Sequence, residues 1–159
     1  MHMNKRKNIL IGGITGGIGS SVAKMLSRES HTISGYARSK DKMIELKSEC
    51  PSIHSFTADA TDTTDLATTF KAARETMGSI DIYIHAIGSI IIKPAHLTNQ
   101  AQWLDTLNLN LSSAFYAMKE ALAIMQKQSD GSLIFYSSTA ARIGIPNHEA
   151  IAASKAGIE

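Results

Sequence analysis

The segment "GGITGGIG", Gly12–Gly19, has the composition of a phosphate-binding turn between an apolar run and a helical pattern. Glycine takes positive φ readily and lets a backbone approach a phosphate closely. A helix that begins there directs free N–H groups and the positive end of its dipole toward the anion. We therefore expect a nucleotide-binding segment, with a plain strand-to-helix turn as the alternative.

A second candidate segment, "SGYARSK", closes the next apolar run. An NAD-selective site carries Asp or Glu at this position to bind the ribose 2′-hydroxyl. Here Ala37 occupies it, and Arg38 and Ser39 follow, with Lys40 as a further candidate. Because a guanidinium can bind a 2′-phosphate through two hydrogen bonds, the segment favours NADP(H) over NAD(H). The alternative is a solvated loop arginine.

Short apolar runs alternate with longer amphipathic segments along the chain. The expected strands are Asn8–Gly12, His31–Tyr36, Ser52–Thr57, Asp81–Ala86 and Ser132–Ser137. The expected helices are Gly17–Arg28, Lys40–Glu49, Thr64–Met77, Asn99–Lys127 and one from Glu149 onward. Runs that are apolar throughout predict a parallel sheet with helices on both faces, an α/β fold of the doubly wound Rossmann type in three α/β/α layers.

With no internal repeat or linker, we expect one NAD(P)-binding Rossmann domain over residues 1–159. The last segment, "AIAASKAGIE", has helical composition and no capping residue that closes it at the chain end. We therefore expect the domain to be incomplete, with its C-terminal strands missing.

Five motifs, in order, resemble the short-chain dehydrogenase/reductase family, and its 3-oxoacyl reductases in particular. The glycine turn resembles the pattern TGxxxGxG, with Gly12 in the place of Thr, and "ADATD" supplies the acidic residue after the third strand. "IDIYIHAIG" resembles "LDILVNNAG", although the Asn that braces the family's sheet is replaced by Ala86. "WLDTLNLNLSSAF" and "GSLIFYSSTAARIGIP", followed by "AASKAG", resemble the segments of the active-site Asn, Ser and Lys. The resemblance spans Lys7 to Glu159.

The resemblance implies a set of cofactor contacts. Asp59 is expected at the adenine ring, and Lys155 at the nicotinamide ribose. The full set expected to bind the cofactor is Gly13, Thr15, Gly16, Gly17, Ile18, Gly19, Arg38, Ser39, Asp59, Ala60, Ala86, Gly88 and Lys155.

The resemblance also implies three catalytic residues, Asn110, Ser138 and Lys155. In the family, Ser hydrogen-bonds the substrate carbonyl, Lys lowers the pKa of a Tyr, and Asn bends its helix and holds a water that links Lys to solvent. The plainer alternatives are a strand-end cap for Ser138 and an ordinary helix-bend residue for Asn110.

The family's Tyr, thirteen residues after the Ser, transfers the proton, but this chain has Ile151 there. Isoleucine cannot transfer a proton, and loss of a general acid costs about 10²–10⁴-fold in rate. His148 is a replacement candidate by virtue of its pKa range, with a surface loop histidine as the alternative. We expect Tyr136 to pack in the sheet and His85 to be a core histidine with its hydrogen bonds satisfied.

Composition excludes several classes of protein. The net charge of +2 is too small to indicate nucleic-acid binding, and Lys5–Lys7 is typical of a solvated flank. Cys50 is the single cysteine, which excludes disulfides and cysteine metal sites within the chain and fits a reducing cytoplasm. No metal site is expected. No apolar run approaches the roughly 20 residues that span a bilayer.

Two functions follow from the sequence. The first is an NADP(H)-dependent oxidoreductase of a small carbonyl or alcohol substrate, with an atypical active site, which retention of Ser138 favours. The alternative is an inactive NADP(H)-binding sensor or scaffold, which Ile151 favours. The resemblance further implies a homodimer or homotetramer of the full-length protein, paired through the helices after the fourth and fifth strands.

Overall fold

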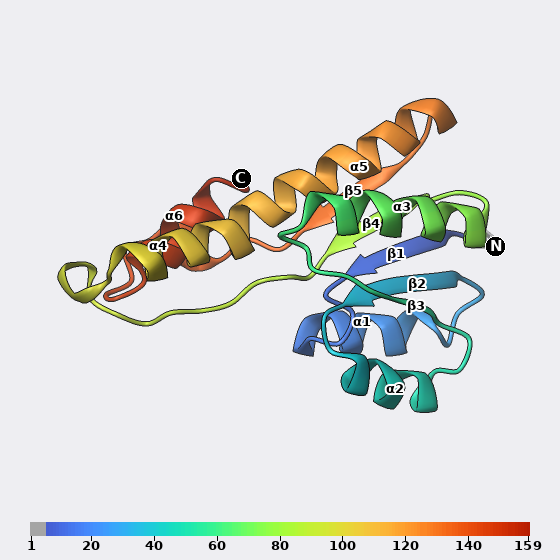
Figure 1. The fold of residues 1–159 in the computed structure, drawn as a ribbon, viewed down its shortest axis with the longest axis horizontal. Helices are drawn as coiled ribbons and strands as arrows, with labels where there is room; N and C mark the ends of the chain where they lie inside the picture. Colours follow the sequence, from blue (N-terminus) through green and yellow to red (C-terminus); the bar gives the residue numbers. More distant parts are fainter. Residues whose placement is uncertain (1–5) are drawn as a thin grey trace.

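The computed structural model describes residues 6–159, so Lys5 of the basic cluster lies outside the described residues. Five parallel strands form one sheet in the order β3-β2-β1-β4-β5 (Figure 1). The strands are β1 (Asn8–Gly12), β2 (Thr32–Ala37), β3 (His54–Thr57), β4 (Ile82–His85) and β5 (Ser132–Phe135). The order reverses between β1 and β4, and ligands of open parallel sheets bind beyond the strand ends at such a point. The predicted fold class is confirmed.

Helices cover both faces of the sheet. The α-helices are α1 (Gly17–Leu26), α2 (Lys40–Glu49), α3 (Thr63–Met77), α4 (Gln100–Leu107), α5 (Ser113–Gln128) and α6 (Glu149–Ala156). Short 3₁₀ turns η1 (Ala95–Leu97) and η3 (Thr139–Ala141) and a π-helical turn η2 (Asn108–Ser112) complete the set. Figure 1 shows α1 and α2 on one face and α3 and α5 on the other.

Alternate residues of β1 enter two separate cores. Leu10 packs with Leu66 and Phe70 of α3, whereas Ile9 and Ile11 belong to the core beneath α1 and α2. The central strands β1, β2 and β4 are therefore buried almost throughout, as predicted. The edge strands β3 and β5 contain exposed residues, so the prediction of buried strands is wrong there, because each edge strand has a neighbour on one side only.

Capping residues decide several element ends. Asp62 accepts from two backbone N–H groups at the start of α3, and Gly78 ends that helix with φ 87°, as predicted. At the chain end α6 stops at Ala156, with Gly157 at its C-cap. The expectation of a helix without a capping residue is therefore wrong.

The long helix predicted over Asn99–Lys127 is three elements. Asn99 begins α4 with a reciprocal capping box to Gln102, the π turn η2 follows, and α5 continues to Gln128. A π turn carries one extra residue per turn, so side chains beyond it point in new directions. Helices α4 and α6 pack against each other at one end of the molecule, in line with α5 (Figure 1). Among the described residues, no helix has the length and apolar character needed to cross a membrane.

Candidate functional site

A pocket of about 510 Å³ opens beyond the carboxyl ends of β1, β2 and β4. It contains nine of the residues predicted to bind a cofactor: Gly13, Thr15, Gly16, Arg38, Ser39, Asp59, Ala60, Ala86 and Gly88. Gly17, Ile18, Gly19 and Lys155 were predicted with them but do not line it. The pocket lies at the point where the strand order reverses, as expected for a doubly wound sheet.

The glycine turn needs two of its glycines for its own shape. Gly13 has φ 75°, and its carbonyl accepts from the Gly16 N–H at 2.9 Å. A Cβ at Gly19 would overlap the Gly13 carbonyl oxygen, so glycine there lets α1 lie directly against the turn. A Cβ at Gly17 would meet nothing within 4 Å. Gly17 and the half-exposed Ile18 therefore present the first turn of α1 to open space, where an anion could approach.

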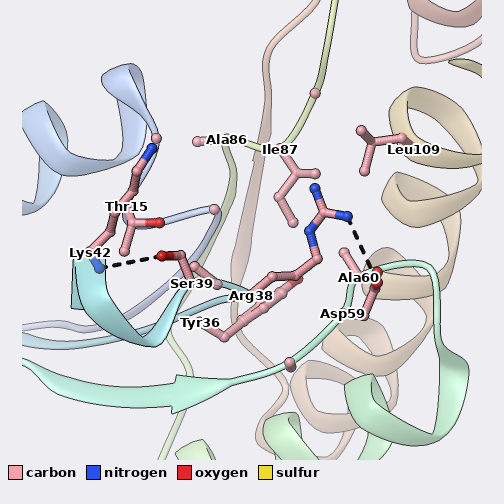
Figure 2. Close-up of a pocket in the computed structure, with 15 residues that line it drawn as sticks. Thr15, Tyr36, Arg38, Ser39, Lys42, Asp59, Ala60, Ala86, Ile87 and Leu109 are labelled. Carbon is pink, nitrogen blue, oxygen red and sulfur yellow. Dashed lines mark hydrogen bonds and ion pairs between the residues drawn. The ribbon is translucent and has the colours of Figure 1, made fainter. Parts of the chain in front are cut away.

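Arg38 and Asp59 form an ion pair in the pocket lining. Arg38 Nη1 is 4.0 Å from Asp59 Oδ2, and Figure 2 shows the guanidinium reaching across the pocket toward Ile87. The backbone N–H of Thr61, its hydroxyl and the Arg38 charge lower the pKa of Asp59 despite partial burial. An exposed pair at this distance is weak, so Arg38 is free to turn to another anion.

Ser39 and Lys42 add polar groups beside Arg38. The Ser39 hydroxyl caps α2 by accepting from the Lys42 N–H at 3.3 Å. This cap places Lys42 on the first turn of the helix, within the pocket wall (Figure 2). Lys42 was not predicted from the sequence, although Ser39, three residues earlier at the start of a helical pattern, is a signal that indicates it.

Asn110 and Lys155 meet around Gly88. A Cβ at Gly88 would lie 2.8 Å from Asn110 Oδ1 and 3.5 Å from Lys155 Nζ. Asn110 is fully buried in the π turn and accepts from the Ser89 N–H at 3.0 Å. Lys155 donates to the Tyr136 carbonyl at 3.0 Å, and burial lowers the pKa of its ammonium. Since Gly88 lines the pocket, these two of the three predicted catalytic residues lie just behind its wall.

Ser138 stands at the start of η3, where its hydroxyl accepts from the Ala140 N–H at 3.2 Å. The neighbouring Ser137 hydroxyl donates to the Glu159 carboxylate at 2.8 Å and also lies 3.4 Å from the Lys155 carbonyl oxygen. Arg142 Nε donates to the other Glu159 oxygen at 2.8 Å. Glu159 thus holds both flanks of the Ser138 loop against α6.

Ile151 lies in the first turn of α6 and is 5% exposed. The position predicted to carry the proton donor is therefore a buried hydrocarbon. His148 is the N-cap residue of α6, and its Nδ1 lies 2.8 Å from the Pro146 carbonyl, a bond within its own loop. His85 is 1% exposed and bonded to Tyr83 and Ser113, which confirms the prediction of a core histidine.

The comparison with known proteins agrees with this geometry. A sequence profile described as short chain dehydrogenase matches residues 7–159. The chain belongs to the short-chain dehydrogenase family. Members of this family are NAD(P)-dependent oxidoreductases.

Individual relatives are distant and longer than this chain. A 3-oxoacyl-[acyl-carrier-protein] reductase of Staphylococcus aureus is 27% identical, with 98% of this chain matching 65% of that protein. A 2-(S)-hydroxypropyl-CoM dehydrogenase of Xanthobacter autotrophicus is 29% identical, over 98% of this chain and 63% of that protein. The crystal structure of an actinorhodin polyketide ketoreductase with NADPH superposes with a TM-score of 0.89 at 23% identity, covering 99% of this chain and 63% of the other. The chain thus spans under two thirds of the length of these short-chain dehydrogenase relatives.

Within the described residues, no cluster of three or more His, Cys, Asp and Glu side chains could hold a metal ion. Apart from the Asp59 carboxylate, the polar groups of this short-chain dehydrogenase site are amides, hydroxyls and cations, which suit an anionic organic ligand.

Proposed function

We propose that residues 1–159 form the NADP(H)-binding Rossmann domain of an oxidoreductase that interconverts a small carbonyl compound and its alcohol. The observation that carries this proposal is the pocket at the β1–β4 switch point, with a glycine turn on one side and Arg38, Ser39 and Lys42 on another. Ala37 occupies the position at the end of β2 where an NAD-selective site has a carboxylate, so nothing at that position repels a 2′-phosphate.

The residues fit this cofactor. The glycine turn offers backbone N–H groups at the start of α1 and open space at Gly17, as a pyrophosphate requires. Arg38, Ser39 and Lys42 would hold the 2′-phosphate, and Asp59 the adenine ring. The cofactor, when bound, supplies the hydride chemistry.

Three residues of the chain are assigned to the reaction centre. Lys155 would hold the nicotinamide ribose, Ser138 would hydrogen-bond the substrate oxygen, and Asn110 would support Lys155 from the π turn. The adjacency of Asn110 and Lys155 around Gly88 supports this assignment. Ile151 has no proton to give, so the proton comes from another group or from water.

A second function from a different class is an NADP(H)-binding sensor or scaffold without turnover. The observation that favours it is Ile151, which fills the donor position with a buried hydrocarbon.

The experiment that tests both functions is a fluorescence titration with NADPH and, in parallel, NADH. We expect the affinity for NADPH to exceed that for NADH by at least about tenfold, because the 2′-phosphate adds charge-assisted hydrogen bonds. No binding of either nucleotide would overturn both functions. Oxidation of bound NADPH by a panel of ketones, ketoacyl thioesters and quinones then separates the enzyme from the sensor.

We further propose a homodimer or homotetramer for the full-length protein. Exposed apolar side chains of α4 and α5, Leu104, Phe115 and Leu122, support a buried helix interface. Light scattering checks the mass in solution.

Location in the cytoplasm is also proposed, because Cys50 is a free buried thiol, a state that a reducing compartment preserves.

A further inference from the structure

A continuous chain of hydrogen bonds crosses the core beneath the pocket. The Tyr36 and Tyr83 hydroxyls are 2.8 Å apart, and the Tyr83 hydroxyl is 2.8 Å from His85 Nδ1. His85 Nε2 is 3.3 Å from the Ser113 hydroxyl. All four residues are at most 1% exposed, so each polar atom depends on the next for its hydrogen bond. We call these four residues the buried chain.

The buried chain runs in one direction. The Ser113 hydroxyl donates its single hydrogen to the Leu109 carbonyl at 2.6 Å, so it accepts from His85. His85 therefore carries its proton on Nε2, which leaves Nδ1 to accept from the Tyr83 hydroxyl. Tyr83 then accepts from Tyr36. Aligned bonds of this kind polarise and strengthen one another in a low-dielectric interior.

The buried chain ends on a carbonyl that the π turn leaves without its α-helical partner. The Ser113 N–H bonds to the Asn108 carbonyl, five residues back, and not to Leu109, four residues back. The Ser113 hydroxyl replaces that N–H as the donor to Leu109. Asn110 is the next residue along the π turn, and Leu109 itself lines the pocket. The Ser113 end of the buried chain therefore contacts the π turn that positions Asn110.

The other end of the buried chain adjoins the glycine turn. The Tyr36 carbonyl accepts from the Gly13 N–H at 2.9 Å and the Ile14 N–H at 3.3 Å. The hydroxyls of Tyr36 and Tyr83 each lie 2.7 Å from where a Cβ of Gly12 would be. The two hydroxyls therefore sit against the backbone of the turn.

We propose that Tyr36, Tyr83, His85 and Ser113 are positioning residues that hold the π turn, and with it Asn110, at a set place relative to the glycine turn. None of the four needs to touch a substrate. The link from Asn110 to cofactor chemistry rests on the proposed function, whereas the link from the buried chain to the π turn does not.

The test is hydrogen exchange by NMR on the whole chain, without cofactor, comparing Tyr83→Phe with Tyr116→Phe. Both changes remove one tyrosine hydroxyl from the same core, but the Tyr116 hydroxyl has no hydrogen bond with any described residue. We expect Tyr83→Phe to speed exchange of the amides of residues 108–114 and of the Asn110 side chain by about tenfold. Tyr116→Phe should leave these rates unchanged. Equal rates in the two variants, or a uniform increase across all sheet amides, would overturn the proposal.

The direction of the buried chain gives a second test. Tyr83→Phe leaves the Tyr36 hydroxyl without an acceptor and His85 without a donor, whereas Tyr36→Phe orphans no donor. The larger effect on the π turn should therefore come from Tyr83→Phe; the reverse order would overturn the proposed direction. If Tyr83→Phe does not fold, the ¹⁵N shifts of His85 in the unmodified protein test the proposed direction. That direction requires the tautomer of His85 with its proton on Nε2, so a proton on Nδ1 would overturn it. NADPH binding is measured in a separate experiment. A failure to bind NADPH would overturn the proposed function but would not affect the hydrogen-exchange result.

Discussion

Gly12 lies directly against the side chain of Tyr36, whose hydroxyl would be 2.7 Å from a Cβ at position 12. The Tyr83 hydroxyl is equally close. The threonine of the family pattern therefore has no room here. Gly12 lacks the hydroxyl of that threonine, and the space that the threonine side chain would fill is occupied by the hydroxyls of Tyr36 and Tyr83 from the two neighbouring strands.

We predict that Gly12→Ala destabilises the fold by about 1–3 kcal/mol, because the added methyl group overpacks the core against both tyrosines. Urea unfolding measures the change. Gly17→Ala is the matched control, since its Cβ would meet nothing within 4 Å and alanine suits the first turn of a helix. Similar losses of stability in the two variants would contradict the prediction.

Arg38→Ala should weaken NADPH binding by about tenfold to a hundredfold while changing NADH binding little, because a guanidinium–phosphate bond is charge-assisted. Fluorescence titration with each nucleotide gives both affinities. Arg28→Ala removes the same group from an exposed turn outside the pocket and serves as the control. An equal loss of affinity for NADPH and NADH would show that Arg38 does not bind the 2′-phosphate.

Ile151→Tyr should raise NADPH oxidation by about 10²–10⁴-fold with a suitable ketone, the usual worth of a placed general acid. Steady-state rates, with circular dichroism as the check on folding, measure this. Ile151→Phe provides the ring without the hydroxyl and should gain nothing. A gain in both variants would mean that the ring, and not the proton, is responsible.

His148→Ala separates the replacement acid from a loop histidine. If His148 transfers the proton, its loss should lower native turnover by about 10²-fold or more without altering thermal stability. Because its Nδ1 is bonded to the Pro146 carbonyl, Nε2 would be the transferring atom. Unchanged turnover would remove His148 from the mechanism.

Stability should fall with pH below about 6.5, the ordinary pKa of histidine. Burial, with a smaller contribution from the nearby Lys155 charge, lowers the pKa of His85 to about 3. Between these values the unfolded chain binds a proton at His85 that the folded chain does not, so acid favours unfolding. The expected slope from this residue rises from about half of 1.4 kcal/mol per pH unit at pH 6.5 to nearly that full value at pH 5.5.

Urea unfolding between pH 6.5 and 5.5 measures this slope, in a range where carboxylates contribute little. His85→Gln removes the titrating group, and its slope should be smaller by that amount. An identical slope in the variant would show that His85 is not responsible.

Much of the fold could be predicted because it depends on local pattern. Apolar runs such as Ile9–Ile11 identify the central strands, and Asp62 and Gly78 mark the ends of α3. The prediction that the strand β5 is buried was wrong, because burial at an edge depends on which strands and helices lie nearby. The π turn was also missed, because it is held by tertiary contacts, such as the bond from the Ser89 N–H to Asn110, that no sequence window contains.

The sequence by itself determined which chemical groups are available: a glycine turn, Ala37 in the usual acidic position with Arg38 after it, and Ile151 in the proton donor's position. Only the tertiary structure decided what these groups touch. Tyr36 and Tyr83 are 47 positions apart and His85 and Ser113 are 28 apart, yet they form one buried hydrogen-bonded chain. The reason is physical: a local pattern records which side chains must leave water, whereas the pairing of their polar atoms is set by the parallel register of strands distant in the chain.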